Sequence, residues 1–116
     1  MARANHISQT LLSLNPINFP EAWYANGLAH YFLQHLTEAE NSARRGLAVD
    51  PAHQVPKLEY LLGTVLLERA NYSEATGHLQ AFLSLVTKPS EIAEAQRQLA
   101  EAARLSATRQ LAAEKK

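Results

Sequence analysis

Residues 20–53 read PEAWYANGLAHYFLQHLTEAENSARRGLAVDPAH, and this stretch decides the fold. Trp23, Gly27 and Tyr31 are spaced four apart, which places them on one face of a helix. A second helix follows and ends before Pro51, because proline cannot continue a helix. The stretch therefore predicts a pair of helices joined by a short turn.

The same pattern returns in residues 56–89. Gly63 follows Gly27 by 36 positions, and Ala75 follows Ala39 by the same interval. One helix pair in every period of about this length is typical of a helical repeat array. We expect the two glycines to let neighbouring helices pack closely, because they lack a Cβ atom.

The composition limits the class of protein. The chain has 116 residues, enough for one small domain, with 47% hydrophobic and 19% charged residues. Eleven basic residues balance eleven acidic ones, so no positive excess favours nucleic acid or an anionic membrane as a partner. Cysteine is absent, which excludes disulfides and thiolate metal sites.

Targeting signals are not evident in the printed sequence. No apolar run approaches the ~20 residues that span a bilayer, and MARANHISQT at the N-terminus lacks the apolar segment of a signal peptide. Either the protein is cytoplasmic, which we favour, or a leader and further domains lie outside the printed sequence.

Residues 1–18 are similar to the second half of an earlier repeat. Residues 3–14 carry an apolar stripe made of Ile7, Leu11, Leu12 and Leu14, and Asn15-Pro16 closes it. A repeat unit cannot bury its apolar face alone, so we expect this half-repeat to be an open end of the array.

Polar residues predict where the first helix pair begins. Asn18 is placed to cap a helix from Pro20 to about Gln34. Thr37 is placed to cap the second helix, and Glu40 three residues later would complete a capping box.

The remaining helices are predicted in the same way. Residues 56–69 are apolar on nearly the whole helix circumference, as expected of a helix buried on two sides. The next helix begins at Asn71 or Ser73 and ends at Pro89. We expect the core to be filled by Trp23, Leu62, Leu66, Leu79 and Phe82.

Ser90 is placed to cap a last helix that has a narrow apolar stripe and a polar outer face. A helix of this kind at the end of an array is typical of a terminal cap. We expect the tail beyond Leu105 to fray, because the stripe thins there.

These residues resemble the tetratricopeptide repeat (TPR) family, which spaces Trp, Leu-Gly, Tyr, Ala, an aromatic, Ala and Pro over about 34 residues. The first unit supplies Trp23, Gly27, Ala39, Leu47 and Pro51, and the second supplies Leu62, Gly63, Tyr72, Ala75 and Leu83. The chain departs from the pattern at Asn26, His30, Ala43, Gly46, Glu59 and Thr87.

The resemblance implies an all-α fold, a right-handed α-solenoid of antiparallel helix pairs with about five helices. It divides a single domain, residues 1–116, into a half-repeat (1–18), two repeats (20–53 and 56–89) and a C-terminal capping helix (90–116).

Residues that could carry chemistry are few. The five histidines, His6, His30, His35, His53 and His78, include no i,i+4 pair, so no helical zinc face forms, and we interpret them as surface or turn residues. The sequence has no glycine-rich phosphate loop and no convergent acid, base or nucleophile. We therefore expect neither catalysis nor a metal or cofactor.

Asn26 and His30 lie four apart on a face that the family buries. They are either ligand contacts or a buried pair that satisfy each other by hydrogen bonding. We favour the pair, because buried polar groups are nearly always paired.

The resemblance also implies a binding surface, since the first helices of successive TPR units line a concave groove that receives a peptide. Carried over position by position, the groove residues here are Glu21, Tyr24, Leu28, Tyr31, Phe32, Lys57, Tyr60, Thr64, Leu67 and Glu68. Tyr24 and Leu28 stand where some members hold a C-terminal carboxylate with Lys and Asn, so that clamp is not expected. Tyr31 and Phe32 could equally be core residues, whereas Tyr24 and Tyr60 suit a half-wet surface.

The resulting functional hypothesis is a non-catalytic protein–protein interaction scaffold that binds a peptide segment or partner helix in this groove. The alternative is structural self-association, a homo-oligomer formed through the open N-terminal helix end. A monomer with a free groove favours the scaffold. Neither hypothesis involves nucleic acid or a membrane.

Overall fold

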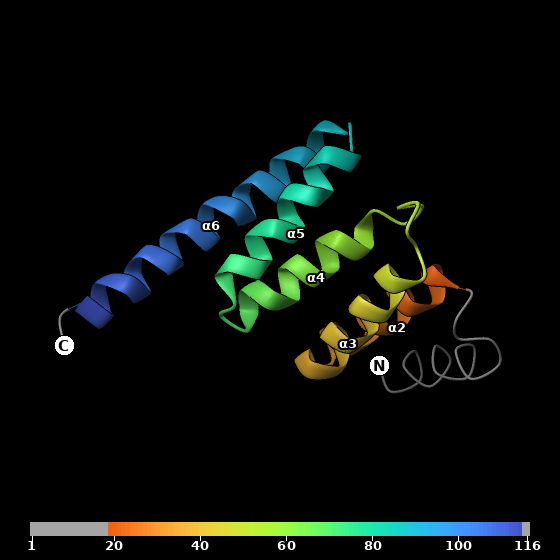
Figure 1. Cartoon of the computed structure of the whole chain (residues 1–116), viewed down its shortest axis with the longest axis horizontal. Coiled ribbons are helices and arrows are strands. Elements are labelled where there is room, and N and C mark those ends of the chain that lie inside the picture. Colours follow the sequence, from red (N-terminus) through yellow and green to blue (C-terminus); the bar gives the residue numbers. More distant parts are fainter. Residues whose placement is uncertain (1–18, 115–116) are drawn as a thin grey trace.

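The computed structural model describes residues 19–114 of the chain (Figure 1). Within this range the protein is all-α, with no strand. Its helices are α2 (Pro20–Phe32), α3 (Leu36–Ala48), α4 (Lys57–Glu68), α5 (Tyr72–Leu85) and α6 (Pro89–Glu114). The predicted all-α class with about five helices is confirmed, while the half-repeat at 1–18 lies outside the described residues.

The helices pack mainly on their neighbours in the chain, and successive helices run in opposite directions (Figure 1). α4 makes additional contacts with α2 and with α6. The molecule is elongated, with extents of 51 × 32 × 22 Å. This arrangement is repeat-like, and the right-handed superhelical path implied by the resemblance stays a prediction.

The core is centred on α4, which lies between α3 and α5. The largest fully buried side chains of the core are Leu58, Leu62, Val65 and Leu66 of α4 and Leu79 of α5. Small residues of the flanking helices, Ala39 and Ala43 of α3 and Ala75 of α5, form one apolar cluster with Leu61, Leu62, Val65 and Leu66 of α4. Burial on two sides explains why α4 is apolar around its circumference. All five residues predicted to fill the core are buried.

Glycines mark the closest helix contacts. A Cβ atom on Gly63 would lie 2.8 Å from Cγ of Leu79, and one on Gly27 would lie 2.9 Å from Cδ2 of Leu61. Real Cβ atoms essentially never come this close to a neighbour, so neither position accepts alanine without movement. The prediction that both glycines permit close packing is confirmed.

The predicted capping box at Thr37 is wrong. α3 begins two residues earlier than predicted, at Leu36, with His35 in place of Thr37 as its N-cap residue and no side-chain cap hydrogen bond. The reason is the end of α2, where Gln34 has a φ of 64° and the His35 N–H donates to the carbonyl of His30 at 2.8 Å. This left-handed turn is a Schellman-type end of α2, and it brings the chain into α3 at Leu36, so that Thr37 already lies inside the helix and cannot cap it.

The same turn recurs between α4 and α5. Ala70 has a φ of 64°, and the Asn71 N–H donates to the carbonyl of Leu66 at 2.9 Å. Ala70 and Gln34 are 36 positions apart, so the two helix pairs share their turn as well as their packing. The sequence left Asn71 and Ser73 as alternative starts for the next helix. α5 begins at Tyr72 with Asn71 as its N-cap residue, which agrees with the first alternative.

The last helix also differs from expectation. It begins at Pro89, so Ser90 lies in its first turn and is not its cap, and it is helical beyond Leu105, as far as Glu114. Alanine and long polar side chains favour the helix here. Nη1 of Arg109 also donates to the carbonyl of Ala70 at 2.9 Å, which fixes this part of α6 to the α4–α5 turn. No helix in residues 19–114 is long and apolar enough to cross a bilayer.

Candidate functional site

A groove runs along α2, α4 and α6, which line a connected series of hollows. The ten predicted groove residues, Glu21, Tyr24, Leu28, Tyr31, Phe32, Lys57, Tyr60, Thr64, Leu67 and Glu68, all line these hollows. The structure therefore brings together every residue that the resemblance assigned to this surface. Their role in binding stays a prediction.

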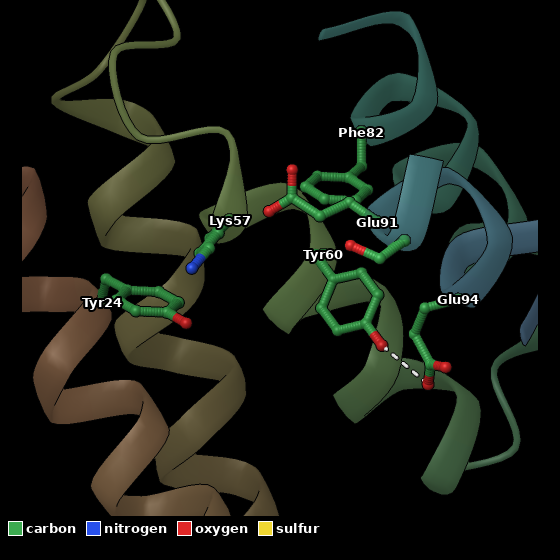
Figure 2. Close-up of a pocket in the computed structure, with 7 residues that line it drawn as sticks. Tyr24, Lys57, Tyr60, Phe82, Glu91 and Glu94 are labelled. Atoms are coloured by element: carbon green, nitrogen blue, oxygen red, sulfur yellow. Dashed lines mark hydrogen bonds between the residues drawn. The ribbon is translucent and has the colours of Figure 1, made fainter. Parts of the chain in front are cut away.

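The middle of the groove, here called the central hollow, has a volume of about 290 Å³ (Figure 2). Its lining residues are Tyr24, Lys57, Tyr60, Phe82, Ser90, Glu91 and Glu94. Figure 2 shows the ring of Tyr24 approaching from α2 and the ring of Tyr60 from α4, with Glu94 on the α6 side and the carboxylate of Glu91 reaching past the Phe82 ring toward Lys57. The ring of Phe82 lies 5.1 Å from that of Tyr60 and is only 2% exposed, so it forms the base.

Hydrogen bonds hold α6 against α4 at this place. The Tyr60 hydroxyl donates to Oε1 of Glu94 at 3.3 Å and accepts a bond from Nε2 of Gln98 at 2.8 Å. Gln98 in turn accepts from the Thr64 hydroxyl at 3.0 Å. The wall that α6 contributes to the groove is thus fixed by polar contacts between side chains.

The surroundings of Glu94 and Tyr60 set the protonation state of each side chain. Arg97 forms an ion pair with Glu94 and holds the pKa of that carboxyl below its usual value. Burial raises the pKa of Tyr60, and the nearby Glu94 carboxylate raises it further. At neutral pH Glu94 is therefore ionised and Tyr60 keeps its proton, which is the combination that the observed bond requires.

The end of the groove near the C-terminus of α2 is apolar. Leu28, Tyr31 and Phe32 line its α2 side together with Leu61 of α4, while Thr64, Glu94 and Gln98 border it, and we call this the apolar end. The sequence left open whether Phe32 belongs to the core or to the surface. Its side chain is 61% exposed, so it is not a core residue. Tyr31 is half-buried, and its ring lies 5.6 Å from that of Phe32 in an edge-on arrangement. Burial, helped by Glu68, raises the pKa of Tyr31 to about 12.

Sequence reasoning missed the part of the groove that α6 supplies. Glu91, Glu94 and Gln98 line it, although the last helix was predicted only as a terminal cap. A signal was present: Glu94 follows Tyr60 by 34 residues, and Gln98 follows Thr64 by the same interval. This interval is close to the 36 residues that separate Gly27 from Gly63, so α6 follows α4 by about one period of the sequence.

Asn26 and His30 do not bond to each other, and that prediction is wrong. Nδ2 of Asn26 donates to the Ser42 hydroxyl at 2.7 Å, while Nδ1 of His30 lies 3.4 Å from Nδ1 of His35. Each residue finds a partner outside α2, because α3 and the turn before it lie beside this face. Burial lowers the pKa of His30, and the positive form of His35 lowers it further, against an opposing effect of Glu38.

The remaining histidines are only partly as predicted. His30 is buried, at 5% exposure, so the surface interpretation is wrong for it, whereas His35 and His53 are exposed. Nδ1 of His78 lies 2.6 Å from Oε2 of the buried Glu59. His6 lies outside the described residues. Residues 19–114 contain no group of three or more metal-ligating side chains that could hold a metal ion.

A scan of the chain against models of known protein families found no match, and a search of curated proteins found none. The likeness to TPR units therefore rests on the residues of this chain alone.

Proposed function

We propose that this protein is a non-catalytic interaction module that binds a peptide segment or helix of another protein in the groove along α2, α4 and α6. One observation carries the proposal. The side chains that line the groove include an aromatic residue, Phe32, that is 61% exposed, together with the half-buried rings of Tyr24, Tyr31 and Tyr60. Exposed apolar surface bordered by polar groups is typical of a binding site.

The rigidity of the groove also supports binding. The ten predicted groove residues all lie on α2 or α4, and the hydrogen bonds from Tyr60 to Glu94 and from Gln98 to Tyr60 connect α4 to α6. A preformed surface loses little conformational entropy when a partner binds. Tyrosine adds a large contact area with few rotatable bonds, which is why it is frequent among residues that dominate binding energy.

The alternative of self-association depends on the apolar stripe at residues 3–14, which lies outside the described residues. It remains a prediction of the sequence, and light scattering tests it.

A selection with a random peptide display library tests the proposal. The full chain is the bait, and enriched peptides are synthesised and measured by calorimetry. Phe32→Ser should weaken their binding at least about tenfold, because truncated aromatic anchors commonly cost ~2 kcal/mol or more.

Leu111→Ser is the matched control, since Leu111 is 59% exposed on α6 and does not line the groove hollows. We expect both substitutions to change the free energy of unfolding by no more than about 0.5 kcal/mol, as usual for exposed positions. Peptides that bind the wild type and the Phe32 variant equally would contradict the proposal. So would a selection that enriches no peptide.

A further inference from the structure

The groove is negatively charged although the whole chain is neutral. Its hollows are lined by five carboxylates, Glu21, Glu68, Glu91, Glu94 and Glu101, and by two cations, Lys57 and Arg97. Arg97 pairs with Glu94, and Glu101 pairs with Arg104. Within residues 19–114, Glu21, Glu68 and Glu91 take part in no ion pair, which leaves three uncompensated carboxylates against Lys57.

The central hollow combines this charge with aromatic walls. Figure 2 shows the carboxylates of Glu91 and Glu94 on the same side as Phe82 and Tyr60, facing Tyr24 across the hollow. A cation is attracted to aromatic rings and to carboxylates alike. The aliphatic stem of a lysine or arginine can at the same time cover apolar surface. An acidic side chain in this place would instead meet two carboxylates.

The apolar end lies at a defined distance from the central hollow. Tyr24 and Phe32 are eight residues apart on α2, and the two hollows share Tyr24, Tyr60 and Glu94. Eight helical residues rise about 12 Å. Residues i and i+4 of an extended chain face the same side and are about 13 Å apart. One extended peptide along α2 can therefore reach both places with side chains four positions apart.

We propose that the partner is a basic peptide segment of another protein, which places a Lys or Arg side chain in the central hollow and a large apolar side chain, four residues away, against Phe32. This inference rests on the proposed function and adds to it the chemistry and spacing of the ligand. Lys57 also lines the central hollow, and Figure 2 shows its ammonium group beside the Tyr24 ring. Its side chain is exposed, so a bound cation can displace it toward water and take its place near the carboxylates.

Three labelled nine-residue peptides test the inference against the full chain by fluorescence anisotropy. Each peptide has phenylalanine at one position and alanine or serine at most others. The three peptides differ only in the residue four positions before the phenylalanine, which is lysine, glutamine or glutamate. We expect the lysine peptide to bind at least about tenfold more tightly than the glutamate peptide, and its affinity to fall with added salt, which screens charge. Glu91→Gln should reduce the lysine-to-glutamine preference about three- to tenfold.

Glu38→Gln is the matched control, since Glu38 is an exposed carboxylate on α3 that does not line the groove hollows. It should leave the preference unchanged. Equal binding of the three peptides, with loss of all three in Phe32→Ser, would overturn the basic ligand while leaving the groove as a peptide site. The same conclusion follows if none of the three binds but peptides from the display library do. If neither set binds, the proposed function fails as well.

Discussion

Gly63 and Gly77 offer a direct comparison of a crowded and an open helix position. A Cβ at Gly63 would lie 2.8 Å from Cγ and 3.0 Å from Cδ2 of Leu79, and 3.3 Å from the carbonyl oxygen of Ala75. At Gly77 nothing lies within 4 Å. Gly63→Ala and Gly77→Ala therefore add the same methyl group to the interiors of two neighbouring helices with opposite surroundings.

The expected difference follows from two opposing effects. Replacing a glycine inside a helix with alanine raises the free energy of unfolding by about 0.5–1 kcal/mol. At Gly63 overpacking opposes this gain and costs about 1–3 kcal/mol, because Leu79 is fully buried and the Ala75 carbonyl is backbone. We expect Gly63→Ala to lower the free energy of unfolding by roughly 0.5–2 kcal/mol and Gly77→Ala to raise it by roughly 0.5–1 kcal/mol.

Urea and thermal unfolding followed by far-UV circular dichroism measure both variants. In a domain of this size each kcal/mol moves the melting temperature by about 4–8 °C, so the two curves separate clearly. Equal midpoints would refute the contact assigned between α4 and α5. Gly27→Ala is an intermediate case, because its nearest neighbour is the terminal Cδ2 of Leu61, which can shift.

Ala70→Gly should raise the free energy of unfolding by about 0.5–1 kcal/mol, because Ala70 has a φ of 64°, a backbone conformation in which glycine is unstrained. A lower melting temperature of this variant would contradict the expectation. Burial raises the pKa of Tyr31 to about 12, above its value in the unfolded chain, so stability should fall as the pH rises from about 10 to 12. Tyr31→Phe should make that fall shallower in melts over this range. The stripe at residues 3–14 predicts association in light scattering, and a strict monomer at high concentration would argue against it.

The period of the sequence accounts for most of the predicted fold. Because Gly27 and Gly63 sit at equivalent positions, the helix pairs and the buried faces could be placed from the residue spacing alone. The exact first residues of α3 and α6 could not be predicted from this spacing. The turn at Gln34 depends on a left-handed backbone conformation that no glycine signals, and Thr37 carried a stronger but unused capping pattern.

The site was predicted on two of its three helices. Positions carried over from the family lie together along α2 and α4, because equivalent residues of stacked units face the same way. The contribution of α6 was missed, since a polar outer face such as that of Glu91 and Gln98 is equally typical of a terminal cap. The exposure of Phe32 was also undecided, because it stands at the last residue of α2, where helical periodicity no longer separates core from surface.

Binding of a peptide along α2, α4 and α6 can be mapped by titrating a display-selected peptide into the isotopically labelled full chain and following backbone amide shifts by NMR. We expect the largest changes at Tyr24, Phe32, Tyr60 and Gln98, with little change at Gly77 on α5. Changes centred on α3 and α5, or around the buried Asn26, would contradict it.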